Sequence, residues 1–246
     1  MGASSLSVLL LRFTPGPEEL VAMGAKLCYS AAGIGDLRQG IEHRDQSGFL
    51  KHILASGHLS PIEHASFTFG IEGVSRSLLA QITRHRIASF SVKSQRYVSE
   101  VSDKREDKVF NYIIPPRIRD LGPEQVRRFE SQMRQIQEWY DYWVEQLGNK
   151  GESSNEDARF VLPNASETKM VVTMNARELL HFFSLRCCNR AQWEIRALAT
   201  EMLRLVKAVA PVIFKDAGPD CLSGKCPEGK MSCGKSEEVR KKFSSL

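Results

Sequence analysis

A basic segment in the first half of the chain has the residue types best suited to binding an anion. Residues 84–97 read Arg-His-Arg-Ile-Ala-Ser-Phe-Ser-Val-Lys-Ser-Gln-Arg-Tyr, so cations and hydroxyls are interleaved with apolar side chains. Guanidinium groups bind phosphate oxygens bidentately, and hydroxyls complete the shell. The segment therefore reads either as the wall of a phosphate pocket or as a solvated basic turn.

A second polar segment, residues 57–64, holds His58, Glu63 and His64 in a turn. Histidine and glutamate are metal ligands, but a helical zinc motif places its two histidines four residues apart on one face. This spacing differs from that motif, and closure of the turn by polar side chains is the alternative. No metal is predicted here.

The cysteines offer two further chemistries. Cys187 and Cys188 follow Arg186, and a nearby cation could activate a nucleophilic thiol, although buried packing is the alternative. Cys221, Cys226 and Cys233 lie in a Gly-rich tail and could hold zinc only with a fourth ligand from elsewhere. Free thiols in a flexible extension are the other interpretation, so the sequence predicts no metal.

The order of the basic segment resembles the signature of the flavin-dependent thymidylate synthases. In that signature Arg-His-Arg is followed, after seven residues, by a serine, which is Ser94 here, and then by Arg96. Further segments around residues 57–64, Arg159 and 175–186 resemble the same family in the same order. The resemblance spans about residues 20–210 and leaves the tail outside it.

The resemblance implies a reaction and its participants. The expected reaction is reductive methylation of dUMP to dTMP, with 5,10-methylenetetrahydrofolate as one-carbon donor and no enzyme cysteine as nucleophile. FAD reduced by NADPH is the expected hydride source. The resemblance also implies a homotetramer acting on dUMP and folate. The six cysteines make the cytoplasm the expected compartment, and neither a nucleic-acid nor a membrane partner is predicted.

Site residues carry over position by position. The expected catalytic residues are Arg186, which faces the uracil ring where a cation stabilises developing negative charge, and His58, which lies near flavin and folate. The expected substrate-binding residues are Gln81, Arg84, Ser94, Gln95, Arg96, Arg159 and Arg186. The expected flavin-binding residues are Ser60, Arg84, His85, Arg86, Asn175, Arg177 and His181, and a packed helix histidine is the alternative for His181.

One position departs from the family pattern. Many members have an acidic residue two positions before the signature serine, where this chain has Val92. Valine cannot accept the hydrogen bonds that a carboxylate could, which puts that ligand contact in doubt.

Two other functions are compatible with the basic segment. An NADPH-oxidising flavoprotein with another substrate would be yellow but would make no thymidylate. A basic nucleic-acid-binding protein would be colourless and would bind any polynucleotide with strong salt dependence.

Composition sets the limits for the elements that position these residues. The chain has 246 residues, a net charge of +5, 42% hydrophobic and 26% charged residues, and six cysteines, which fits an ordinary globular protein in a reducing compartment. The positive charge favours anionic ligands. No apolar run approaches the roughly 20 residues of a membrane helix.

Hydrophobic periodicity and capping residues predict the elements. The fold expected is α+β: a single domain over residues 1–215, with a small sheet packed by several long helices, followed by a Cys/Gly/Lys-rich extension over 216–246. Strands are predicted at 8–11, 65–73 and 168–174, and helices at 18–28, 45–55, 75–86, 123–147, 153–162, 175–186 and 191–209. Residues 31–40 are predicted to be a mobile Gly-rich loop, and 87–115 a loop with short strands.

Overall fold

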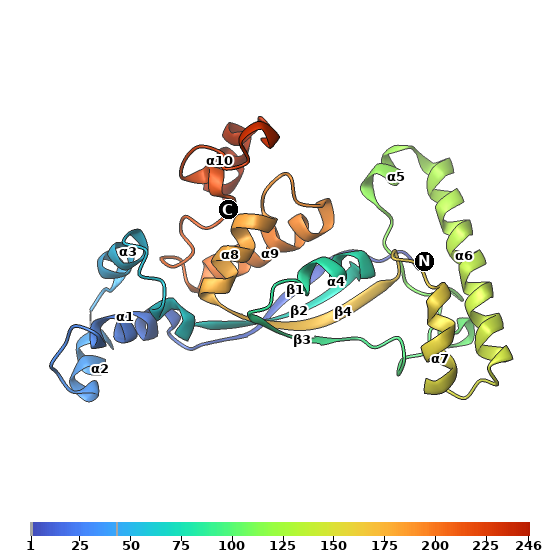
Figure 1. Ribbon diagram of the computed structural model, residues 1–246, viewed down its shortest axis with the longest axis horizontal. Helices are drawn as coiled ribbons and strands as arrows, with labels where there is room; N and C mark the ends of the chain where they lie inside the picture. The colour runs from blue at the N-terminus through green and yellow to red at the C-terminus, as the bar shows by residue number, and fades with distance from the viewer. Residues whose placement is uncertain (1, 43) are drawn as a thin grey trace. The chain divides into compact units, whose positions relative to one another are not determined.

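The computed structural model describes residues 2–42 and 44–246, and it divides into two compact units (Figure 1). The first unit comprises the chain up to Ser7, Ile71–Arg84 and Ser91–Val171. The second comprises Val8–Gly70, His85–Phe90 and Val172–Leu246. Each unit is therefore assembled from separate stretches of sequence.

Helices and a small antiparallel sheet make up the described chain, which confirms the α+β prediction. The strands β1 (Ser7–Phe13), β2 (Ser66–Ser75), β3 (Ala88–Val92) and β4 (Glu167–Asn175) pair in the order β1-β2-β4-β3. Phe67, Phe69 and Ile71 alternate along β2 and are all buried, as predicted. Gly73 of this strand has φ +68°, and a Cβ there would lie 1.8 Å from the Ser5 carbonyl oxygen, so only glycine fits.

The first unit is built around a long helix. It contains α4 (Arg76–Ile82), α5 (Pro116–Asp120), α6 (Pro123–Gln146) and α7 (Glu152–Ala158), with 3₁₀ helices at Ser102–Lys104 and Arg159–Val161. The predicted helix at 123–147 is confirmed as α6, which α7 flanks in Figure 1. Met133 of α6 belongs to a buried cluster with Phe110 and Tyr112 of the loop before α5, and Tyr140 belongs to a second one with Ala158 of α7. These two clusters form the core of this unit.

The second unit holds the remaining helices. These are α1 (Pro17–Leu27), α2 (Ile34–Glu42), α3 (Ser47–Ala55), α8 (Ala176–Arg186), α9 (Trp193–Val209) and α10 (Ser236–Ser244), with 3₁₀ helices at Pro61–His64, Asp220–Leu222 and Gly229–Met231. The core side chains of α8 and α9 include Phe182, Phe183, Leu198 and Met202, all inaccessible to solvent. The helix predicted at 191–209 begins instead at Trp193, because Gln192 acts as N-cap and accepts from the Glu194 and Ile195 amides.

The prediction of a mobile loop at residues 31–40 is wrong. Residues 34–42 form α2, whose Leu37 and Ile41 recur at helical spacing and whose Ile41 is buried. Arg38 and Glu42, four residues apart, pair at 2.7 Å on the exposed side. Packing against α1 and this pair outweigh the low helix propensity of Gly35 and Gly40.

The tail is folded rather than extended. Its last helix, α10, buries Val239 and Phe243 and packs on the short helix at Asp220–Leu222. Within the described residues, no helix is both long and apolar enough to cross a lipid bilayer.

Candidate active site

The helix α4 positions the Arg-His-Arg triplet. Ser75 caps it, as predicted, because its Oγ accepts a hydrogen bond from the Leu78 amide at 3.1 Å. Beyond the end of the helix, Arg84 and Arg86 are exposed whereas His85 is only 5% exposed. The two arginines of the triplet are therefore open to solvent, whereas the side chain of the histidine between them is buried.

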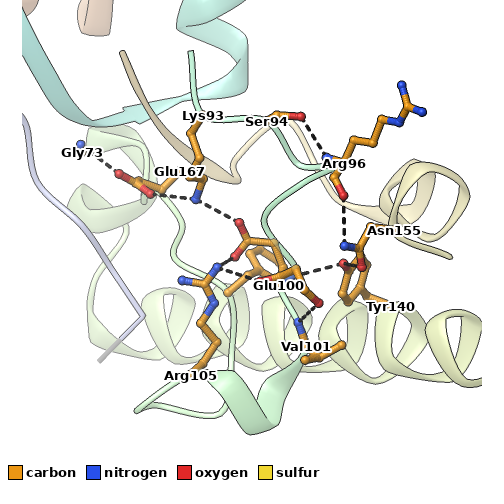
Figure 2. Close-up of polar contacts among 12 residues, drawn as sticks. Gly73, Lys93, Ser94, Arg96, Glu100, Val101, Arg105, Tyr140, Asn155 and Glu167 are labelled. Carbon is orange, nitrogen blue, oxygen red and sulfur yellow. Dashed lines mark hydrogen bonds and ion pairs between the residues drawn. The ribbon is translucent and has the colours of Figure 1, made fainter. Parts of the chain in front are cut away.

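A buried ion cluster anchors the segment that carries Ser94 in the first unit. Figure 2 shows Lys93 pointing toward Glu100 and Glu167, with Nζ at 2.9 and 3.5 Å from their carboxylate oxygens. Arg105 also pairs with Glu100, and Glu167 accepts a hydrogen bond from the Gly73 amide at 3.2 Å. This fixes the backbone immediately before Ser94.

Local hydrogen bonds then shape the next residues. The Ser94 Oγ accepts from the Arg96 amide at 3.2 Å, and the Arg96 carbonyl accepts from Asn155 Nδ2 at 3.0 Å (Figure 2). Asn155 itself is buried in α7 and accepts from the Tyr140 hydroxyl at 3.2 Å. The turn at Ser94–Arg96 is therefore held by the core of its unit.

The Arg96 guanidinium is engaged by acids. It lies 2.7 Å from Glu152 and 2.9 Å from Glu156, both on α7. All three side chains are more than 40% exposed, so each pair is worth only about 0–1 kcal/mol. An incoming phosphate can therefore replace these carboxylates at little cost.

A pocket in the first unit brings together two of the predicted nucleotide-binding residues. Gln95 and Arg159 line a pocket of about 320 Å³ with Arg76, and no carboxylate lines it among the residues described. Burial, and then the like charge of Arg159, lower the pKa of Arg76. Two neighbouring guanidiniums without an acid between them make a site for an anion.

Arg76 is a site residue that the sequence reasoning missed. It stands directly after the cap residue Ser75, in the first turn of a helix treated only as the element leading to Arg84. The sequence signal that could have identified it is a cation in the first turn of a helix, where acidic residues are usually preferred.

Three predicted flavin residues meet in the second unit. Asn175, Arg177 and His181 line a pocket of about 620 Å³ together with the apolar side chains of Leu59, Ile87 and Leu180. Asn175 caps α8 by accepting from the Glu178 amide at 2.9 Å, which confirms the predicted helix start. Arg177 pairs with Glu63, another lining residue.

A chain of hydrogen bonds through His85 connects Glu178 and Arg186, both of α8. His85 Nδ1 lies 2.9 Å from Glu178 Oε1, and Arg186 Nε donates to His85 Nε2 at 3.1 Å. Arginine only donates, so Nε2 accepts and the imidazole is neutral with its proton on Nδ1. Burial is the main cause that lowers the pKa of His85; the Arg186 charge adds to it and the Glu178 hydrogen bond opposes it.

Nine predicted residues line neither of these two pockets: Arg84, His85, Arg86, Ser94, Arg96 and Arg186, described above, and His58, Ser60 and Gln81. His58 is exposed, and its Nδ1 lies 3.3 Å from the Tyr29 hydroxyl. Ser60 is exposed at the start of the 3₁₀ helix Pro61–His64. Gln81 donates from Nε2 to the Ser77 carbonyl at 3.2 Å, within its own helix.

The cysteine beside Arg186 is poorly suited to be a nucleophile. Burial raises the pKa of the Cys187 thiol to about 12. The reactive form of cysteine is the thiolate, which at that pKa is scarce near neutral pH.

The fold is α+β, and each of the two units carries one of these two pockets. Comparison with known proteins gives the family. The model for the family described as thymidylate synthase complementing protein matches residues 9–212. The flavin-dependent thymidylate synthase of Geobacter sulfurreducens is 53% identical over 98% of this chain and 99% of its own length. That of Clostridium tetani is 49% identical over 96% of each chain.

The chain therefore belongs to the flavin-dependent thymidylate synthase family. Solved structures support the fold. The enzyme of Helicobacter pylori, complexed with FAD and dUMP, matches with a TM-score of 0.64 at 22% identity over 86% of this chain and 99% of that one. The UMP/dUMP methylase PolB of Streptomyces cacaoi, bound with 5-Br dUMP, matches with a TM-score of 0.71 at 24% identity, over 87% and 94%.

Proposed function

We propose that this protein methylates dUMP reductively to dTMP. In this reaction 5,10-methylenetetrahydrofolate donates the one-carbon unit, and NADPH supplies the reducing equivalents. The observation that carries the proposal is the pocket at Arg76, Gln95 and Arg159, whose two guanidiniums have no acid beside them among the lining residues described. A nucleotide monophosphate offers the dianion that such a pair of cations binds.

Nucleotide binding extends from this pocket to the neighbouring turn. Ser94 and Arg96 complete the phosphate and sugar contacts, with Arg96 exchanging Glu152 and Glu156 for the ligand. The assignment of Gln81 and Arg84 to the nucleotide rests on the family resemblance.

Arg186 is the residue proposed to polarise the uracil ring. Its Nε is committed to His85, which sets the plane of the guanidinium. A fixed cation stabilises negative charge that develops on the pyrimidine, with no reorganisation during the reaction. Activation of the ring does not require an enzyme thiol, in keeping with the raised pKa of Cys187.

The donor set of the second pocket fits FAD. Arg177 supplies a cation for the pyrophosphate, Asn175 and His181 offer polar contacts, and Leu59 and Ile87 give apolar surface for a flat ring. When bound there, FAD supplies the hydride chemistry. Ser60, Arg84, His85 and Arg86 are the other proposed flavin residues, and His58 is proposed to lie near flavin and folate.

We further propose a cytoplasmic homotetramer. Trp139, Tyr142 and Trp143 of α6 are 49%, 54% and 46% exposed, an apolar surface suited to burial between subunits. All six cysteines are free thiols, as expected in a reducing compartment. Light scattering on the eluting protein tests the subunit number.

The decisive experiment supplies dUMP, methylenetetrahydrofolate, NADPH and FAD and measures dTMP, with FAD omitted in a control. FAD-dependent dTMP is expected. NADPH oxidation without dTMP would point to a flavoprotein with another substrate. Failure to bind FAD, with salt-sensitive binding to any polynucleotide, would favour a nucleic-acid-binding protein.

A further inference from the structure

Four of the cysteines gather at one place in the second unit. Cys188, Cys221 and Cys226 line the same pocket, of about 290 Å³. Cys233 joins them through Asn189, whose Nδ2 lies 3.8 Å from Cys233 Sγ and which directly follows Cys188. Three tail cysteines therefore lie near a fourth in the turn between α8 and α9, and all four are free thiols.

Specific contacts hold the tail at this turn. Arg240 of α10 donates from Nε to the Cys221 carbonyl at 2.9 Å and from Nη2 to the Gly224 carbonyl at 2.7 Å. Glu228, two residues after Cys226, pairs with Arg190, two residues after Cys188. These contacts hold the loop that carries Cys221 and Cys226 at both of its ends.

Positively charged side chains lie beside these cysteines. Arg186 and Arg190 line the same pocket, and their positive charges offset part of the negative charge of four thiolates.

We propose that Cys188, Cys221, Cys226 and Cys233 bind one Zn²⁺ in a tetrahedral four-thiolate site. Zinc accepts four thiolates in structural sites, and the four residues between Cys221 and Cys226 match the spacing of such ligand pairs. In the part of the chain described, no three His, Cys, Asp or Glu side chains are grouped so that they could hold a metal ion, so the four thiols would have to move closer together and release their protons when zinc binds.

The expected role of the metal is structural. Cys188 lies two residues beyond Arg186, so zinc would fasten the turn after α8 to the tail and limit its movement. This inference does not depend on the methylation of dUMP, since four thiolates bind zinc whatever the reaction.

Metal content of the full-length protein, purified under reducing conditions, provides the first test. About one zinc per chain is expected for the wild type. Cys188→Ser, Cys226→Ser and Cys233→Ser are expected to lose most of it. Cys28→Ser is the matched control, because Cys28 is exposed in α1's end region and lies outside the cluster; it should retain the metal.

A second measurement needs no variant and so avoids any folding defect. The wild type is stripped with a chelator, divided, and alkylated with iodoacetamide with and without added Zn²⁺; labelled peptides are then identified by mass spectrometry. Zinc should protect the four clustered cysteines and leave Cys28 reactive. Absence of bound zinc, equal zinc in Cys226→Ser and wild type, or iron with acid-labile sulfide in its place would each overturn the proposal. None of these readouts uses dTMP formation, so the two proposals fail independently.

Discussion

Arg186 is oriented by His85, which receives the guanidinium's Nε hydrogen at 3.1 Å and is itself held by a glutamate on the same helix as Arg186. Both ends of this relay therefore belong to α8, while the imidazole comes from the residue between two exposed arginines. The Arg-His-Arg triplet therefore has a second role, because its histidine orients the guanidinium of Arg186, which is far from it in the sequence.

Replacing His85 by phenylalanine should impair turnover more than nucleotide binding. The ring volume is kept, but Arg186 loses the acceptor that fixes it, and a misplaced catalytic group typically costs about 10²-fold in rate. Steady-state kcat and KM for dUMP measure the split. Glu178→Gln is the control, since its amide oxygen still accepts from Nδ1 and most activity should remain; equal losses in both variants would contradict this relay.

The stability of the protein should fall in mild acid. Burial lowers the folded-state pKa of His85, so below about pH 6.5 the unfolded chain binds a proton that the folded chain resists. This contribution is present above the unfolded pKa and is lost as the pH falls through the folded one. Urea unfolding at neutral and at mildly acidic pH measures it. The pH dependence should be weaker in His85→Phe, and an unchanged dependence would remove His85 as its source.

Arg76→Ala and Arg159→Ala should each weaken dUMP binding by about 10- to 100-fold, because hydrogen bonds to charged groups contribute about 1.5–3 kcal/mol. Calorimetric titration with dUMP measures the effect, and FAD affinity should be unchanged. Arg117→Ala, an exposed arginine of α5, serves as control. Wild-type affinity in Arg76→Ala would exclude that residue from the phosphate site.

Lys93→Met should destabilise the first unit. It leaves Glu100 and Glu167 buried without their shared cation, and removal of one partner from a buried ion pair costs about 3–5 kcal/mol. The free energy of unfolding in denaturant measures the loss. Adding Glu167→Gln should recover part of it, since one uncompensated charge disappears; strictly additive losses would show that the two residues are not coupled.

Most of the fold was predictable because its signals are local. Alternation along β2, the apolar spacing of α6 and the caps Ser75 and Asn175 each act within a few residues. The helix α2 was missed because its glycines lower the local helix propensity. The burial of Ile41, which compensates for this, arises only from tertiary packing.

The candidate site was predictable only in part, because some of its contacts join residues that are far apart in the sequence. The family resemblance pointed to Gln95, Arg159, Asn175 and Arg177, and the structure places the first two in one pocket and the last two in another. Sequence could not pair His85 with Glu178, because 93 positions separate them and only the folded chain brings them together. The proximity of Cys188 to the tail cysteines was missed for the same reason.

The interleaving of the two units has a consequence for how the chain can be divided. The backbone passes between the units after Ser7, Gly70, Arg84, Phe90 and Val171. A single proteolytic cut therefore cannot release either unit as a continuous fragment, and no terminal truncation isolates one of them. Limited proteolysis of the native protein should accordingly yield nicked molecules that stay associated until they are denatured.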